Sequence, residues 1–225
     1  MKYSWHGHSV VQLETISGHR IIIDPFIRDN PATDLKIEDI NVDYIILTHA
    51  HNDHVGDTLE IALKNDATLI AMVEICDYFE SQGIKTHGMN LGGSYAFPFG
   101  KVKLVPALHS SSYNLEDGSI LSLGLPTGVV IDDGVHKVYH AGDTALFSDM
   151  SLIGPVDVAF LPIGDNYTMG IDDALKAVAL LKCEWAIPIH YNTFPLIKQN
   201  PYDFINRLDE GNGLVPNKGQ VYDIN

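Results

Sequence analysis

The sequence has very little cysteine and no long apolar segment. Cys76 and Cys183 are its two cysteines, and their separation fits neither a disulfide framework nor a cysteine-rich zinc knuckle. We expect two reduced, buried thiols, as in a cytosolic protein. No apolar run approaches the roughly 20 residues that span a bilayer, and the first residues lack the apolar core of a signal peptide. The sequence therefore predicts a soluble, cytoplasmic protein.

Basic residues are also scarce. The chain has 14 lysines and arginines against 29 acidic residues, which gives a formal net charge of −15. Phosphate contacts dominate affinity for nucleic acid, so we expect no nucleic-acid partner. A basic peripheral membrane anchor is missing too, and we expect no membrane partner. The expected partner is a small-molecule substrate, and association into a homo-oligomer stays open.

The apolar pattern predicts an α/β (α+β) fold in which helices cover sheets. Hydrophobic residues make up 45% of the 225 residues, enough for a substantial core. Short β-like runs alternate with helical spacings along the chain. We expect strands at 10–14, 20–24, 44–47, 68–71, 95–97, 102–107, 127–131, 137–140, 156–161 and 185–189. We expect helices at 57–65, 74–82, 172–182 and 201–208.

Both halves of the chain show hairpins followed by strand–helix units. No linker separates them, so a single domain of two helix-flanked sheets over residues 1–225 fits best. Asp172 is the expected N-cap of its helix, and Pro201 suits the first turn of the last helix. Residues 26–41, with one helical turn, and 110–124 are expected to be loops that control substrate access.

The stretch from Thr48 to His54 holds four potential metal ligands directly after the buried strand 44–47. They are His49, His51, Asp53 and His54. In an extended continuation of the strand, His49 and His51 project to the same side and can bind one ion. A tight turn then lets the other two ligands face a second ion. We expect no helix here, because positions two apart point to different faces of a helix.

Three later residues each follow an apolar strand. His109 comes after the strand 102–107, Asp143 lies in an Ala-Gly-Asp-Thr run after 137–140, and His190 follows 185–189. Each of them alone could be a capping or core residue. Because all three stand where a strand ends, they can converge on one edge of the sheets. The set favours a two-metal site over the alternative of a histidine-rich surface loop without metal.

The order HxHxDH, a lone His, Gly-Asp-Thr and a final His resembles the metallo-β-lactamase superfamily, from the first strands to His190. The resemblance implies a four-layer αββα sandwich with the metals at one edge. The implied ligands are His49, His51 and His109 for the first metal, Asp53, His54 and His190 for the second, and Asp143 as the bridge. True β-lactamases carry a cysteine where Asp143 stands, which argues for the broad hydrolase branch.

Three further segments are similar to a group of bacterial metal-dependent hydrolases near the ascorbate-6-phosphate lactonases. They are Trp5-His6-Gly7-His8-Ser9, Ile23-Asp24-Pro25 and Tyr167-Thr168-Met169-Gly170. The resemblance implies that His8 reaches the site and binds substrate, the alternative being a strand cap. Asp24 either orients a ligating histidine or caps a turn. Tyr167 either donates to a substrate oxyanion or packs in its loop. Residues 164–166 depart from the group, where a Gly-Gly-His-like run is expected.

Imidazole and carboxylate ligands suit zinc best here, with manganese, iron and nickel as alternatives. Two divalent ions, two aspartates and a bridging hydroxide leave the site with a charge of about +1. We expect this hydroxide to attack a small ester, lactone or phosphoester, and a lactone is preferred. Asp53, with one oxygen free, is the candidate that passes a proton to the leaving group.

Three other functions stay open. A phosphodiesterase or nuclease on the same metal core needs a basic groove, which the sequence does not indicate. A non-catalytic module that binds a ligand through its metals is a second alternative, disfavoured by the complete ligand set. A redox role like that of diiron flavoproteins is the third, and it is disfavoured because such proteins tend to carry an acidic ligand where this chain has His51.

Overall fold

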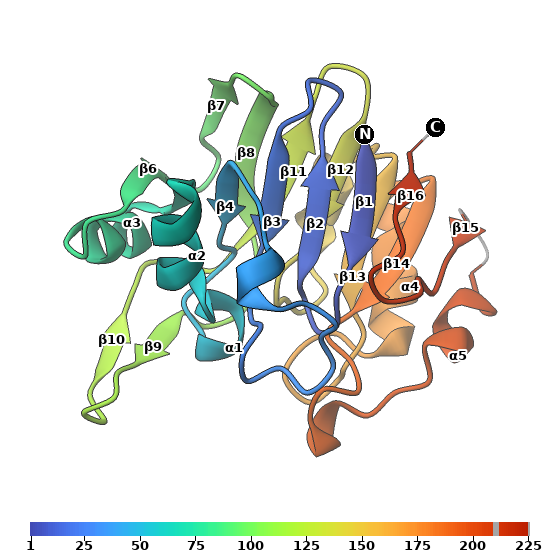
Figure 1. The fold of residues 1–225 in the computed structure, drawn as a ribbon. Coiled ribbons are helices and arrows are strands. Elements are labelled where there is room, and N and C mark those ends of the chain that lie inside the picture. Colours follow the sequence, from blue (N-terminus) through green and yellow to red (C-terminus); the bar gives the residue numbers. More distant parts are fainter. Residues whose placement is uncertain (209–211, 225) are drawn as a thin grey trace.

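The computed structural model, which describes residues 1–208 and 212–224, has two seven-stranded β-sheets packed face to face (Figure 1). The first sheet has the order β16-β1-β2-β3-β4-β5-β6 and the second β15-β14-β13-β12-β11-β8-β7. The first sheet contains β1 (Lys2–Trp5), β2 (Val11–Glu14), β3 (Arg20–Ile23), β4 (Tyr44–Ile46), β5 (Thr68–Met72), β6 (Lys85–Met89) and β16 (Tyr222–Asp223). The second contains β7 (Ser94–Phe97), β8 (Gly100–Pro106), β11 (Thr127–Asp132), β12 (Lys137–His140), β13 (Val158–Pro162), β14 (Trp185–Ile189) and β15 (Asn212–Gly213).

Helices cover both sheets and complete the four-layer αββα sandwich that the resemblance implied. They are α1 (Asn52–Val55), α2 (Thr58–Asn65), α3 (Val73–Glu80), α4 (Ile171–Leu181) and α5 (Pro201–Ile205). The helices α2 and α3 contact the first sheet, and α4 and α5 contact the second. In α4 the buried side chains Ala174, Ala177, Val178 and Leu181 repeat at helical spacing, which lays one apolar face on the sheet. Within the described residues no helix has the length and apolarity to cross a membrane.

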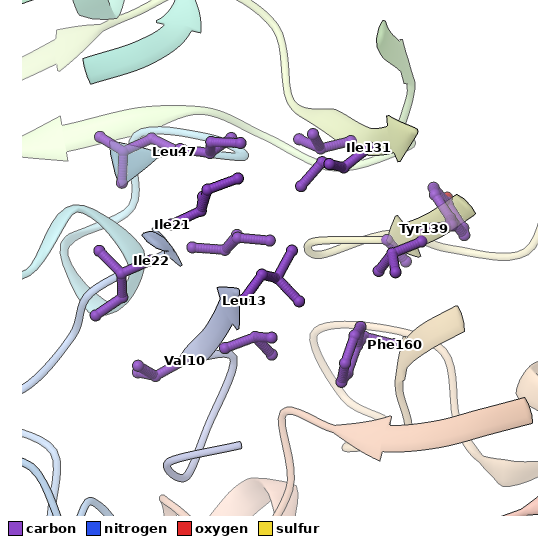
Figure 2. Close-up of a cluster of buried hydrophobic side chains, with 14 of the residues drawn as sticks. Val10, Leu13, Ile21, Ile22, Leu47, Ile131, Tyr139 and Phe160 are labelled. Atoms are coloured by element: carbon purple, nitrogen blue, oxygen red, sulfur yellow. The ribbon is translucent and has the colours of Figure 1, made fainter. Parts of the chain in front are cut away.

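Apolar side chains from the two sheets meet between them. Leu13 and Ile21 of the first sheet point toward Ile131 and Phe160 of the second (Figure 2). The alternating strand pattern produces this arrangement, because every second residue faces the partner sheet. The buried cluster draws on residues from Met1 to Ile224. The expectation of one domain over residues 1–225 nevertheless stays a prediction.

The direction of the strands determines where the site lies. The strands β3, β4, β5 and β6 run parallel, as do β12, β13 and β14. The strand β8 is antiparallel to β11, which is antiparallel to β12, so β8 and β12 share a direction. The loops that follow β4, β8, β12 and β14 carry His49, His109, Asp143 and His190. Parallel strands bring their carboxyl ends to one edge, and this is the edge that the sequence predicted.

Several local expectations differ from the structure. The helix expected at 201–208 ends at Ile205, and Gly170 rather than Asp172 occupies the N-cap position of α4. The loop 110–124 contains a hairpin of β9 (Ser112–Asn114) and β10 (Ile120–Ser122). Such three-residue strands carry too little pattern to be recognised in a sequence. The 26–41 loop has its expected helical turn, Ile37–Asp39.

Candidate metal centre

All seven predicted ligands gather at one place between the strand ends. Two groups form, and within each group one ligand atom from every residue lies within 4.8 Å of the others. The first group is His49, His51, His109 and Asp143, and the second is His8, Asp53, His54 and His190. Residues that are far apart in the chain thus meet as the sequence required. The division differs from the expected ligand sets in two respects: His8 joins the second group, and Asp143, the expected bridge, is grouped with the first.

Three imidazole nitrogens converge in the first group. His51 Nδ1 lies 3.0 Å from His49 Nε2 and 3.2 Å from His109 Nε2. Burial lowers the pKa of all three histidines, and the neighbouring His54 charge lowers it further. They are therefore neutral, with nitrogen lone pairs available. Lone pairs at this spacing match the ligands of a tetrahedral cation whose metal–nitrogen distances are about 2.1 Å.

The second half of the motif is helical, contrary to expectation. His51 is extended and serves as the N-cap position of α1, and Asp53 and His54 lie inside that single turn. Gly56 ends it with φ 42°, and a Cβ at this position would collide with the Pro25 carbonyl oxygen. The expectation of a turn without helix was wrong because a one-turn helix still brings Asp53 and His54 to the second group. Asp53 and His54 therefore face the second group, as expected, but on a helical backbone.

Asp143 stands between the two groups. Its Oδ2 lies 3.0 Å from His190 Nε2 and 3.5 Å from His109 Nε2, and its Oδ1 lies 3.3 Å from His54 Nε2. Burial alone raises the pKa of this carboxyl, but His190 and His54 hold it well below the usual range. The turn that delivers Asp143 requires Gly142, which has φ 59° and lies against Thr48. The position matches the bridging role that the resemblance implied.

Asp24 is buried behind His54 and fixes its ring. Its Oδ2 lies 2.7 Å from His54 Nδ1 and accepts a hydrogen bond from Thr48 Oγ1, while Oδ1 accepts from the Thr48 backbone N–H. Burial alone lowers the pKa of His54, yet Asp143 and Asp24 together raise it well above its usual range. With Nδ1–H donated to Asp24, His54 Nε2 faces Asp143. Of the two roles considered for Asp24, the geometry favours orientation of a ligand histidine.

His8 is fully buried and lies behind Asp53. Its Nε2 is 3.1 Å from Asp53 Oδ2, and its Nδ1 is 2.9 Å from Thr193 Oγ1. Its backbone is left-handed, with φ 52°, and its carbonyl accepts hydrogen bonds from Trp5 Nε1 and the His190 N–H. Burial lowers the pKa of His8 to about 4, so the ring is neutral. It does not line the cleft described next, which favours positioning of Asp53 over contact with substrate.

A cleft of about 600 Å³ opens onto both groups. The residues that line it are His51, Asp53, His109, Ser110, Asp143, Tyr167, His190, Phe194, Pro195 and Leu196. Tyr167 is 52% exposed at this cleft, a position from which its hydroxyl can meet a ligand. The hairpin in 110–124 is tied to the site, because Asn52 and Asn114 exchange two hydrogen bonds.

Four contacts were not foreseen from the sequence. Ser110 Oγ lies 3.2 Å from His51 Nε2, and Thr48 Oγ1 lies 3.0 Å from His49 Nδ1. Thr193 contacts His8, and Phe194 packs edge-on against the same ring. In the sequence, Ser110 and Thr48 are adjacent to candidate ligand histidines. This adjacency could have identified them as hydroxyls that orient an imidazole. Nothing in the sequence distinguishes Thr193 or Phe194 from other loop residues.

The chain is similar in sequence and fold to known proteins. A family model of the β-lactamase superfamily domain matches residues 19–191. The chain is similar to a UPF0173 metal-dependent hydrolase of Enterococcus faecalis, with 53% identity over 219 residues that cover 96% of this chain and 97% of that protein. One from Anoxybacillus flavithermus is 53% identical over 227 residues, the full length of both. Among solved structures, Igni18, a metallo hydrolase from Ignicoccus hospitalis, has a TM-score of 0.90 at 36% identity, covering 100% of this chain and 99% of that one.

Proposed function

We propose that the chain holds two divalent cations and hydrolyses a small ester or lactone. The premise is that it belongs to the UPF0173 metal-dependent hydrolases of the β-lactamase superfamily. The predicted resemblance to this superfamily is confirmed. One observation carries the finer proposal, which is that Asp143 lies within 3.5 Å of His54, His109 and His190 and so joins both ligand groups. A single ion does not need such a shared carboxylate.

The side chains present fit a pair of cations. Among the described residues, His54 Nε2 and Asp143 Oδ1 are buried without a hydrogen-bond partner, although they lie 3.3 Å apart. Buried groups of this kind are normally satisfied, and a cation between them satisfies both. We propose His49, His51 and His109 for one ion, Asp53, His54 and His190 for the other, and Asp143 for both. Neutral imidazoles with carboxylates favour zinc, with manganese, iron and nickel as alternatives.

The chain's own residues divide the remaining work. When bound, the two cations supply a water that ionises near neutral pH and an electrophile that polarises the substrate oxygen. Asp53 is ionised, because His8 and His54 hold its pKa below the usual range although burial alone raises it. Its side chain is 30% exposed toward the cleft, so it can accept a proton and hand it to the leaving oxygen. We propose that Tyr167, which lines the cleft, donates to the oxygen that gains charge.

The proposal is tested on protein purified without added metal and then titrated with zinc or manganese. We expect two equivalents by elemental analysis, and hydrolysis of p-nitrophenyl esters and γ-lactones that a chelator abolishes and metal restores. Asp53→Asn should retain the two ions weakly and lose about 100-fold in kcat, since it keeps its shape but cannot carry the proton. Lys176→Ala, at an exposed position, is the control for handling and folding. One equivalent of metal at full activity would contradict the dinuclear proposal.

His8 is expected to support catalysis through Asp53. His8→Ala removes the hydrogen bond to Asp53 Oδ2, so we expect kcat to fall about 10- to 100-fold while KM and metal content stay nearly unchanged. His8→Gln offers an amide N–H near the same oxygen and should recover part of the loss. His6→Gln is the matched control, because His6 bonds Ser4 and Asp34 away from the cleft. A rise in KM without loss of kcat would instead indicate substrate binding by His8.

No observation favours the phosphodiesterase, the non-catalytic module or the redox protein over the hydrolase. The small-molecule partner, the absence of nucleic-acid and membrane partners, the oligomeric state and the cytoplasmic location stay predictions of the sequence. The substrate panel for the hydrolase also includes bis-p-nitrophenyl phosphate, and turnover of that diester alone would replace the ester proposal with the phosphodiesterase.

A further inference from the structure

One side of the cleft is apolar and faces the ligand groups. Phe194, Pro195 and Leu196, here called the apolar wall, are consecutive residues that line the cleft together with His51, His109 and Asp143. Leu196 is 64% exposed and Pro195 beside it is exposed as well, so both offer apolar surface at the cleft. An exposed apolar side chain beside a polar reaction centre is typical of a surface that a ligand covers.

The apolar wall is held rigidly before any ligand arrives. Pro195 begins a single 3-10 turn, Pro195–Ile197, whose last residue is fully buried. The Asn192 N–H donates to the Ile197 carbonyl, and the Asn192 side chain accepts from the Gln199 N–H. The Phe194 ring packs edge-on against His8 with centroids 5.5 Å apart. A preformed surface binds without an ordering cost, so this wall can contribute its full apolar contact to affinity.

Away from the two ligand groups, the cleft offers no counter-charge for an anionic substituent. Among the residues that the structure describes, no lysine or arginine lines it, and the carboxylates that line it are Asp53 and Asp143. Lys198 follows the wall but lines a separate hollow with Asn192, Gln199 and Asn200. A charged group away from the reacting bond would therefore lose hydration without gaining a partner. The overall charge of −15 adds repulsion for anions that approach.

On the premise of the hydrolase function above, we propose that the substrate is an ester or lactone with an uncharged, apolar acyl chain of medium length. The acyl chain of the substrate lies along the apolar wall, and the carbonyl group of the substrate faces Asp53 and Asp143. In the reaction the oxygen of water joins the acyl carbon as the acyl carbon–oxygen bond breaks. The departing oxygen takes one proton, and the second is lost when the carboxylic acid ionises. The cleft of about 600 Å³ accommodates a ligand of this size.

The test compares p-nitrophenyl acetate, butyrate and hexanoate on the metal-loaded protein. We expect kcat/KM to rise roughly two- to fourfold for each added methylene, the range for partial to full burial. The mono-p-nitrophenyl ester of adipic acid matches hexanoate in length but ends in a carboxylate. It should be at least about tenfold worse than hexanoate, because its charge finds no partner. Equal turnover of these two esters would overturn the proposal.

Two variants locate the effect. Leu196→Asp, at an exposed position, should remove the preference for hexanoate over acetate. Lys198→Ala, two residues further on, should change neither ester. A preference for hexanoate that survives in Leu196→Asp would contradict the role of the wall, while the hydrolase proposal would stand.

A binding measurement tests the apolar wall independently of the proposed hydrolase function. In the metal-free protein, 2-octanone, a ketone that cannot be hydrolysed, should shift the methyl resonances of Leu196 and not those of the exposed Leu152. If that shift occurs but no ester, lactone or phosphodiester is hydrolysed, the proposed function fails and the apolar binding site remains. If esters are hydrolysed without any dependence on chain length, the inference fails and the function remains.

Discussion

Asp143→Asn is expected to bind fewer than two metal ions and to lose at least about 1000-fold in kcat. The substitution keeps the size of the side chain but removes the charge that faces His54, His109 and His190. A shared carboxylate neutralises part of the charge of two adjacent cations, so its loss weakens both positions and separates them. Elemental analysis and ester hydrolysis at saturating zinc are the measurements.

The control for this variant is Asp149→Asn, which removes one negative charge from an exposed position six residues further along. It should keep two ions and unchanged kcat. Circular dichroism of both variants establishes that the fold persists. Two equivalents of tightly bound metal in Asp143→Asn, together with nearly full activity, would show that Asp143 does not join the two groups.

Asp24→Ala is expected to destabilise the metal-free protein by about 3–5 kcal/mol. The carboxylate is fully buried and accepts hydrogen bonds from Thr48, while His54 Nδ1 lies 2.7 Å away. Removing one member of a buried ion pair leaves the other charge without compensation, which costs about that much. Urea unfolding in the presence of chelator measures the change. Metal affinity should fall about 10- to 100-fold as well, since His54 loses the group that orients it.

Asp34→Ala is the matched comparison. It also removes a carboxylate paired with a histidine, because Asp34 Oδ1 lies 2.9 Å from His6 Nδ1, but its side chain is 37% exposed. Solvent screens such a pair, so a loss of about 1 kcal/mol or less is expected, without effect on metal affinity. Equal destabilisation by the two substitutions would mean that burial of Asp24 beside the metal centre has no special importance.

The candidate ligands could be identified from the sequence for a local reason. Each of His49, His109, Asp143 and His190 follows a short run with a strand-like pattern, and such runs can be recognised without any knowledge of their partners. The carboxyl ends of parallel strands share an edge, so residues at those ends lie on the same side of the sheets. Residue type then restricts the chemistry to metal binding.

The sequence was less informative where several weak contacts act together. The four-residue helix α1 has no periodicity to detect, and it forms where Gly56 closes against the Pro25 carbonyl. The hairpin formed by β9 and β10 was expected as a loop, yet it pairs and is fastened by Asn52 to the metal motif. These features depend on neighbours that are remote in the chain, and a local pattern contains no record of them.

The sequence by itself determined which side chains can hold cations and at which edge of the sheets they stand, because both follow from strand patterns and residue chemistry. Only the tertiary structure decided how they divide into two groups around Asp143, and that Asp24 and His8 lie behind them as buried partners. It also decided that Phe194, Pro195 and Leu196 form an apolar side of the cleft. These relations depend on distances between segments as far apart as residues 8 and 193, which packing of the two sheets fixes and no stretch of sequence encodes alone.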